Sequence, residues 1–309
     1  MCNLNSPFFQ DEDKARTYLE AQRWPNGAVC PHCGGDERIY PVKPQQQKGT
    51  SIRKGIYQCN DCDKQFTVTV GTVFERSKVP LHKWLLATYL ICSSKKGIST
   101  KQIERSLGVT YKTAWFMMHR IREAMREKET GKLGGGGRFV EVDETYLVKK
   151  TKRYDKKRTI YDNEKVITLV ERDGAARSFH VKRVTSGTAK RILNEQVFKD
   201  TAIITDQSSI YPRATKDYAG HATVNHSIHE YARGAIHTNT IEGYFSILKR
   251  GLTGIYQHWS SQHLKRYLSE YDFRYTYREK NGFNDMQRTN IALKGIEGKR
   301  ITYGGHYAR

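Results

Sequence analysis

Two pairs of cysteines near the start of the chain constrain its folding most. Cys30 and Cys33 form one Cys-x-x-Cys knuckle, and Cys59 and Cys62 form a second knuckle further along. Thiolates at this spacing can supply the four tetrahedral ligands of a structural zinc ion. A pair of disulfides is the alternative, and a reducing compartment disfavours it. The sequence therefore predicts a zinc ribbon at the N-terminus.

The stretch between the two knuckles is slightly longer than in the commonest ribbons. Residues 41–55 are expected to form an extended hairpin tip that absorbs the extra length. His32 lies inside the first knuckle and could be a zinc ligand. Because four cysteines already complete a tetrahedral site, we expect His32 to be solvated or to lie beside the ligands.

The chain is strongly basic. Its 309 residues include 53 Lys and Arg against 32 Asp and Glu, a formal charge of +21. Such a charge disfavours a compact state unless a polyanion neutralises it, and nucleic acid is the obvious polyanion. The chain has no long apolar run and no N-terminal signal segment, so we expect a soluble cytoplasmic protein associated with the nucleoid.

The densest basic run follows the first strand predicted beyond residue 138. A charge run is often only a solvated loop, but this position favours contacts with the DNA backbone. Its basic residues are Lys149, Lys150, Lys152, Arg153, Lys156, Lys157 and Arg158.

Residues 76–133 are predicted to be helical and to contain a helix-turn-helix. A capping-box pattern at Ser99 opens one helix, and Gly108 supplies the turn before a second helix over residues 111–125. The second helix would be the recognition helix, with Lys112 and Arg120, which lie off its apolar stripe, as candidate DNA contacts. An ordinary helical bundle would have much the same sequence and remains the alternative.

Four consecutive glycines, residues 134–137, are interpreted as a linker because such a run holds regular structure only at high entropic cost. We therefore expect a domain boundary there. The expected domains are an N-terminal helix with the zinc ribbon (1–75), the helix-turn-helix region (76–133), a catalytic domain (138–280) and a C-terminal basic tail (281–309).

Three carboxylates beyond the glycines suggest a site that cuts nucleic acid. Asp143 lies in a β-branched and aromatic stretch typical of a strand, and Asp206 directly follows the short apolar run 202–205. Glu242 lies on a predicted amphipathic helix, and Lys249 follows it two helical turns later on the same side. Hard Mg²⁺ or Mn²⁺ prefers carboxylate oxygens, and two such ions can catalyse phosphodiester displacement.

Solvated surface is the simple alternative for any triple drawn from 32 acidic residues. The placement of the three acids on a strand, at a strand end and on a helix favours a catalytic site over solvated surface. Glu144 adjoins Asp143, but successive strand residues face opposite ways, so we expect only one of them to enter the site and choose Asp143.

The predicted element order beyond residue 138 is three strands, a helix, a parallel strand and further helices. This is the order of an α/β fold with a ribonuclease-H-like core, a mixed sheet with flanking helices. Such a core brings an aspartate of the first strand beside an aspartate of the fourth strand.

Nearly end to end, the chain resembles bacterial insertion-sequence transposases of the DDE superfamily, specifically the ISXO-like group with an N-terminal zinc ribbon. The motif around Glu242 is the most specific part of the likeness. The matching residues are Leu19, Arg23 to Gly27, Cys30 to Gly34, Gln65 to Val68, Gly71 to Phe74, Val142 to Tyr146, Thr205 and Asp206, Asn225 to Ser227, and His237 to Gly251.

The resemblance implies that Asp143, Asp206 and Glu242 hold the catalytic metal ions, two Mg²⁺ or Mn²⁺. It implies that Lys249 lies near the DNA backbone, and Arg250 beside it is a further candidate DNA contact. Some relatives have asparagine in place of the third acid, so Asn239 is an auxiliary or alternative ligand.

Three histidines lie between the second and third acids. His226 and His237 could contact the substrate or act as general acids, and they could equally be structural or solvated. For His229 we favour a structural or solvated role.

The resulting hypothesis is a DNA transposase that binds terminal inverted repeats through its ribbon and helix-turn-helix, then cuts and joins strands at the carboxylates. Its partner would be double-stranded DNA, both the repeat ends and the target. Because two ends must be paired, a homodimer or larger assembly is expected. The alternatives are a non-catalytic zinc-dependent DNA-binding regulator derived from a transposase, and a stand-alone metal-dependent nuclease.

Overall fold

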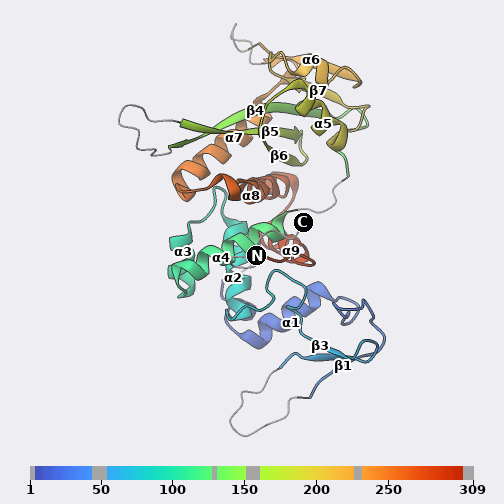
Figure 1. Cartoon of the computed structure of the whole chain (residues 1–309), viewed down its shortest axis with the longest axis vertical. Helices are drawn as coiled ribbons and strands as arrows, with labels where there is room; N and C mark the ends of the chain where they lie inside the picture. Colours follow the sequence, from blue (N-terminus) through green and yellow to red (C-terminus); the bar gives the residue numbers. More distant parts are fainter. Residues whose placement is uncertain (1–3, 44–53, 127–130, 151–160, 226–231, 302–309) are drawn as a thin grey trace. The chain divides into compact units, whose positions relative to one another are not determined.

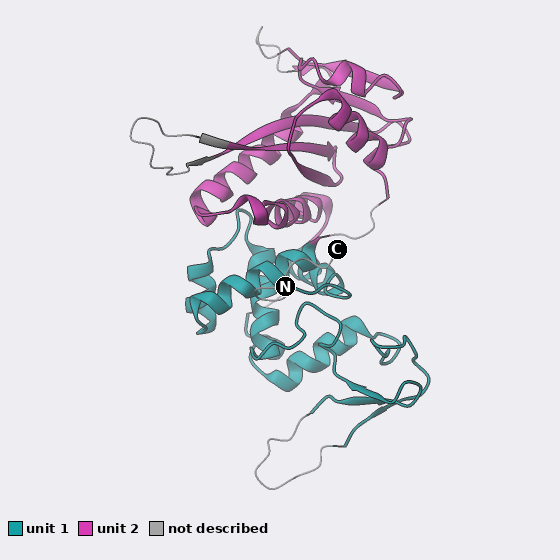
Figure 2. Ribbon diagram, viewed as in Figure 1, with its two compact units in different colours: residues 1–125, 284–309 teal, residues 126–283 magenta. Residues whose placement is uncertain are grey.

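The computed structural model describes residues 4–43, 54–126, 131–150, 161–225 and 232–301 of the chain. The chain divides into two compact units (Figure 2). Unit 1 comprises residues 1–125 and 284–309, and unit 2 comprises residues 126–283. Across the described ranges, each helix is too short or too polar to cross a bilayer.

Unit 1 begins with a short helical turn, a helix and the predicted ribbon. The elements are η1 (Pro7–Phe9), α1 (Glu12–Arg23), β1 (Ile39–Pro41), β2 (Tyr57–Cys59) and β3 (Lys64–Phe66). The three strands form an antiparallel sheet in the order β1-β2-β3. Trp24 packs edge-on against Tyr57 and Phe66, which gives the small ribbon an aromatic core. β1 and β2 confirm the base of the predicted hairpin, whose tip at residues 44–53 lies outside the described residues.

The predicted pair of helices around Gly108 is present. The helical part of unit 1 contains α2 (Leu81–Ser93), α3 (Thr100–Leu107) and α4 (Tyr111–Met125). Ser99 and Gln102 form the predicted capping box at the start of α3. Gly108 ends α3 in the left-handed conformation, with φ of 58°, which a residue with a side chain adopts at a cost.

The C-terminal segment corrects one prediction, because it is not simply a basic tail. Residues Asp285–Lys294 form helix α9, which belongs to unit 1 and packs against α1, α2 and α4. Beyond the helix, the Val73 N–H donates to the carbonyl of Ile296 at 3.1 Å. The prediction is based on the basic charge of the segment. It overlooks the sequence signal for a helix, a capping box of Asn284 and Gln287 followed by apolar residues.

Unit 2 is built on a five-stranded mixed sheet in the order β6-β5-β4-β7-β8 (Figure 1). The strands are β4 (Phe139–Lys150), β5 (Tyr161–Glu171), β6 (Ala176–Val181), β7 (Ala202–Thr205) and β8 (Gly220–Thr223). β4, β5 and β6 form an antiparallel meander, whereas β7 and β8 run parallel to β4. This order confirms the ribonuclease-H-like core.

Helices cover both faces of this sheet (Figure 1). On one face, Val140, Val142 and Ile203 pack with α5 (Ser186–Gln196) and α6 (Tyr211–Ala214) in one buried cluster. The other face carries the helices that follow in sequence, α7 and α8. Their bounds, with those of the neighbouring short elements, are β9 (Ala232–Arg233), β10 (Ile236–His237), α7 (Asn239–Gly251), the π-helical turn η3 (Leu252–Tyr256), η4 (Ser261–His263), α8 (Leu264–Thr276) and η5 (Glu279–Asn281).

The four glycines at 134–137 do not form the predicted linker. They belong to unit 2, and all four adopt positive φ, between 59° and 80°. Their amides are held in place: the Gly134 N–H donates to Glu171 Oε2, and the Gly135 N–H donates to Thr201 Oγ1 at 2.9 Å. Glycine is needed here because the run combines left-handed backbone with a close approach of Gly134 to the Thr201 side chain, features that composition alone does not reveal.

A comparison of Gly134 and Gly137 distinguishes the cost of a left-handed backbone from the cost of steric crowding. A Cβ at Gly134 would lie 2.1 Å from Thr201 Oγ1, whereas one at Gly137, with a similar φ of 78°, meets nothing within 4 Å. We expect Gly137→Ala to destabilise unit 2 by about 1 kcal/mol through left-handed strain. Gly134→Ala should cost roughly 1 to 3 kcal/mol more through overpacking. Urea unfolding of both variants checks this, and equal losses would contradict a close approach at Gly134.

Candidate functional site

The register of two parallel strands brings the first two acids together. β4 pairs with β7 from Phe139↔Ala202 to Val142↔Thr205, the last pair of the ladder. Asp143 and Asp206 are the residues that follow on each strand. Both side chains are therefore at the carboxyl end of the β4–β7 ladder. Open α/β sheets place their ligand-binding groups at the carboxyl ends of strands.

A third carboxylate joins them, and it is one that the sequence analysis set aside. Oxygens of Asp143, Glu144 and Asp206 all lie within 4.8 Å of one another, and all three side chains are half-buried. The expectation that only one of Asp143 and Glu144 enters the site is wrong. The alternation rule holds inside a sheet, but β4 has no β7 neighbour beyond Val142, so the longer Glu144 side chain can reach around the open edge.

Tyr211 fixes Glu144 from the opposite face of the sheet. The buried Tyr211 hydroxyl donates a hydrogen bond to Glu144 Oε2. Burial, and then the charge of Glu144, raise the pKa of Tyr211 above its ordinary value, so this hydroxyl stays protonated as a donor. Sequence reasoning missed Tyr211, whose signal was its place just beyond Asp206 in the chain.

The crowded carboxylates disfavour their own ionisation. Burial, and then the neighbouring charge of Asp206, raise the pKa of Asp143 to about 8, although the Glu144 N–H donates to Asp143 Oδ1 at 2.7 Å. Burial also raises the pKa of Glu144. Several acids that cannot all be charged together form an arrangement that a bound cation would relieve.

Glu242 approaches the same acids from α7. Its charge contributes to the raised pKa of Asp143, after burial and the closer carboxylates. The Glu242 side chain is exposed, and Thr238 Oγ1 donates to its Oε1 at 3.0 Å. The structure therefore brings the third predicted acid near the first two, as an exposed neighbour of the tight cluster.

The other predicted residues of α7 are exposed along the same helix. Asn239 begins α7, while Lys249 and Arg250 lie in its last turn. Lys249 Nζ lies 5.9 Å from the centre of the Phe245 ring. Asn239 as an alternative ligand, and both basic residues as DNA contacts, stay predictions.

The histidines have different outcomes. His237 Nδ1 lies 3.3 Å from Glu141 Oε1 and 3.2 Å from Arg172 Nη2, so its ring belongs to the support of α7. His226 and His229 lie outside the described residues.

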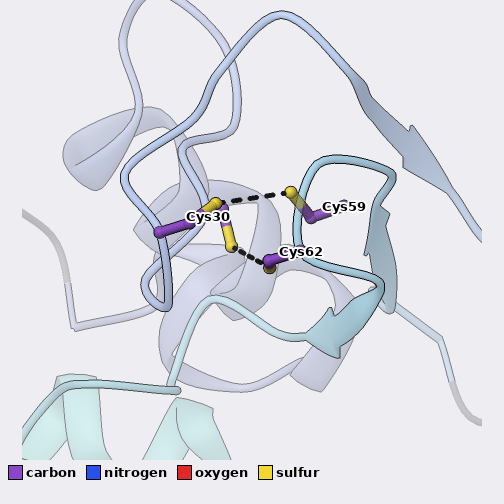
Figure 3. A group of neighbouring side chains, drawn as sticks. Cys30, Cys59 and Cys62 are labelled. Atoms are coloured by element: carbon purple, nitrogen blue, oxygen red, sulfur yellow. Dashed lines mark hydrogen bonds between the residues drawn. The ribbon is translucent and has the colours of Figure 1, made fainter.

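The predicted zinc ligands converge in unit 1 (Figure 3). Sγ atoms of all four cysteines lie within 4.8 Å of one another, with Cys30 and Cys62 at 3.7 Å and Cys33 and Cys59 at 3.6 Å. Four sulfurs about 2.3 Å from a tetrahedral zinc ion would be about 3.8 Å apart, so the geometry fits zinc.

The thiols differ in their ionisation: burial raises the pKa of Cys62 to about 12, whereas the pKa of Cys30 is lowered. Burial opposes ionisation of Cys30, but hydrogen bonds from the Cys33 and His32 amides outweigh it and lower its pKa to about 7. The His32 side chain is exposed and outside the four-sulfur group, in line with the prediction that it is not a ligand.

The structure describes some of the predicted DNA contacts and leaves others outside the described residues. Lys112 is exposed near the start of α4, where a recognition helix makes its base contacts. The run from Lys152 to Arg158 lies outside the described residues, and the side chains of Lys149 and Lys150 are not described either.

Arg120 corrects the prediction for α4. Its guanidinium is buried, with Nη2 donating to the Glu75 carbonyl at 2.9 Å and its plane near the Phe116 ring. This burial removes Arg120 from the candidate DNA contacts. Helical periodicity placed it away from the apolar stripe, but α4 is covered on more sides than a single stripe predicts.

The zinc ribbon gives a direct test. Cys59→Ser should remove about one equivalent of bound zinc per chain and unfold the ribbon, because a structural zinc site contributes folding free energy. His32→Ala is the matched control and should keep its zinc. Metal content by mass spectrometry and thermal unfolding measure both effects, and a Cys59→Ser protein with full zinc content would contradict the assignment.

The carboxylate cluster predicts how stability depends on pH. The raised pKa of Asp143 means that the folded state holds a proton which the unfolded chain releases near pH 4. Without Mg²⁺ or Mn²⁺, this group therefore lowers stability as pH rises from about 4 to 8.

Asp143→Asn should remove that loss. We expect the variant to unfold like the parent protein near pH 4 and to be more stable by at least about 1 kcal/mol at pH 8, since one pKa unit corresponds to about 1.4 kcal/mol. Urea unfolding across this pH range measures the difference, and parallel pH profiles would show that the cluster carries no such strain.

Comparison with known proteins places both sites in recognised domains. Residues 132–276 match the ISXO2-like transposase domain, and residues 10–65 match the transposase zinc-ribbon domain. The chain is also 28% identical over 282 residues to a Halobacterium salinarum protein described as an uncharacterized protein in transposable element ISH50, covering 86% of this chain and 91% of that protein. The first match contains the carboxylates and the second contains the four cysteines. The chain therefore carries an ISXO2-like transposase domain, preceded by a transposase zinc ribbon.

Proposed function

We propose that this transposase binds the terminal inverted repeats of its element and carries out metal-dependent DNA strand cleavage and strand transfer. The observation that carries the proposal is the meeting of Asp143 and Asp206 at the edge of the β4–β7 ladder, with Glu242 approaching from α7. The match of residues 132–276 to a transposase domain supports the same reaction class.

The donor set fits hard divalent cations. Asp143, Asp206 and Glu242 would hold two Mg²⁺ or Mn²⁺ ions. Burial and then the charge of Asp206 raise the pKa of Asp143, and such ions would offset both effects. When bound, the ions supply the Lewis acidity required for in-line phosphodiester displacement. Glu144, held by Tyr211, lies close enough to be a further oxygen ligand.

The protein's own groups would position the DNA. Lys249 and Arg250, exposed in the last turn of α7, are placed to contact phosphates. Water would cleave a phosphodiester at the element end and leave a 3′-hydroxyl, which would then attack the target DNA and displace a 3′ oxygen there. The ribbon and the exposed start of α4 would recognise the repeats, and a dimer would pair two ends. This chemistry would take place in the cytoplasm, on nucleoid DNA.

The acids should separate cutting from binding. Asp206→Asn and Glu242→Gln should each slow cleavage by more than about a hundredfold, because each loses several kcal/mol of charge stabilisation in the transition state. Both should still bind duplexes made from the DNA that flanks the gene. Gel-shift and cleavage assays in Mn²⁺ measure the two properties.

Asp217→Asn is the matched control, since this exposed aspartate of unit 2 pairs with Lys190 at 3.0 Å and should cut normally when replaced. Unchanged cutting by the acid variants would refute the site. Repeat binding without cutting by the parent protein would identify a regulator instead. Cutting without joining would identify a nuclease.

A further inference from the structure

A buried carboxylate two residues before Asp143 connects the sheet to the helix that carries Glu242. Glu141 lies on β4, and its side chain is fully buried. On a strand, alternate residues share a face, so Glu141 projects from the same face as Asp143, toward α7. The domain match and the sequence motifs assign no role to this residue.

Glu141 caps the start of α7. Its Oε2 accepts a hydrogen bond from the Ile241 N–H at 2.9 Å. Ile241 occupies the third position of the helix, where an amide lacks an intrahelical acceptor. A negative charge at this end also interacts favourably with the helix dipole. The cap is therefore a charged group from a distant strand, and the next residue after the capped amide is Glu242.

Arg172 completes the junction. Its Nε donates to Glu141 Oε1 at 2.8 Å, which provides the buried carboxylate with a charged partner. Its two other nitrogens donate to the carbonyls of Ala235 at 2.6 Å and His237 at 3.0 Å, in the hairpin that leads into α7. The same guanidinium thus holds both the cap and the backbone immediately before the helix.

The junction also restricts the Glu242 side chain. Thr238 is buried at the N-cap of α7, between the anchored His237 carbonyl and the capped Ile241 amide. Its hydroxyl donates to Glu242 Oε1 at 3.0 Å. Fixing the backbone on both sides of Thr238 therefore fixes the hydroxyl that orients the acid.

We propose that Glu141, with Arg172, is a positioning residue that holds the start of α7 so that Glu242 reaches the Asp143 and Asp206 carboxylates. Glu141 contacts neither DNA nor metal in this role. It acts through Ile241 and Thr238 on the placement of one ligand. This inference rests on the proposed function, because it assigns a purpose to a contact of the same site.

Metal dependence distinguishes positioning from general stabilisation. Glu141→Ala should raise the Mn²⁺ concentration for half-maximal cleavage by about tenfold to a hundredfold, the usual effect of losing a partner that orients a metal ligand. Excess Mn²⁺ should restore part of the rate. Glu141→Gln keeps an oxygen that can accept from Ile241, so it should show a smaller shift, and it serves as the test protein if the alanine variant does not fold.

Glu171→Gln is the matched control. Glu171 is also a buried carboxylate on a strand of unit 2 and pairs with Arg138 at 2.6 Å, but its second oxygen accepts from the Gly134 N–H rather than from an amide of α7. We expect a loss of thermal stability from this variant, with the same Mn²⁺ dependence as the parent protein. An equal shift of the half-maximal Mn²⁺ concentration in Glu141→Ala and Glu171→Gln would overturn the proposal. So would the absence of a shift in both Glu141 variants.

A double-mutant cycle tests whether Glu141 acts through Glu242. On a Glu242→Gln background, Glu141→Ala should cause no further loss of Mn²⁺ affinity, whereas independent effects would add. Mn²⁺ binding followed by electron paramagnetic resonance provides this readout without DNA. Additive losses would refute positioning through Glu242. A parent protein that neither binds Mn²⁺ nor cuts DNA would instead refute the proposed function itself, which keeps the two failures apart.

Discussion

The end of the β4–β7 ladder is the constraint on which the rest of unit 2 depends. Pairing stops at Val142↔Thr205, and each strand next presents an aspartate. Apolar packing of Val140 and Ile203 fixes that register, because a slip by one residue would turn these side chains out of the core. The hydrophobic core therefore forces two like charges together at the sheet edge. The resulting repulsion favours either a proton or a cation there.

Three acids lie within four consecutive residues of β4, and each behaves differently because its side chain has a different partner. Glu141 is fully buried beside Arg172 and caps α7. Asp143 lies next to Asp206, and burial with that charge raises its pKa to about 8. Glu144 accepts from Tyr211 on the opposite face. Strand alternation places Glu141 and Asp143 on one face and Glu144 on the other, and the partner of each side chain decides whether the carboxylate supports the fold or is available as a ligand.

Periodic patterns predicted most elements and the meeting of Asp143 with Asp206, because strand order and strand ends are local properties of the sequence. The errors arose where distant partners decide the outcome. Four glycines indicate a linker until Glu171 and Thr201 supply acceptors for their amides. Arg120 lay off the apolar stripe, yet the Glu75 carbonyl and Phe116 enclose it. Glu144 was excluded by a rule that fails once the neighbouring strand has ended.

The chain keeps its two kinds of metal site apart by donor chemistry. The ribbon in unit 1 offers four thiolates, which suit zinc, and the sheet edge in unit 2 offers carboxylate oxygens, which suit Mg²⁺ or Mn²⁺. We expect the small ribbon to need its metal to fold, since three short strands bury little apolar surface. The sheet has a buried apolar core of its own, and an ion there would offset a repulsion that this core creates. Metal would therefore stabilise the structure of unit 1 and serve the chemistry of unit 2. We expect that DNA binding and DNA cleavage can therefore be lost separately.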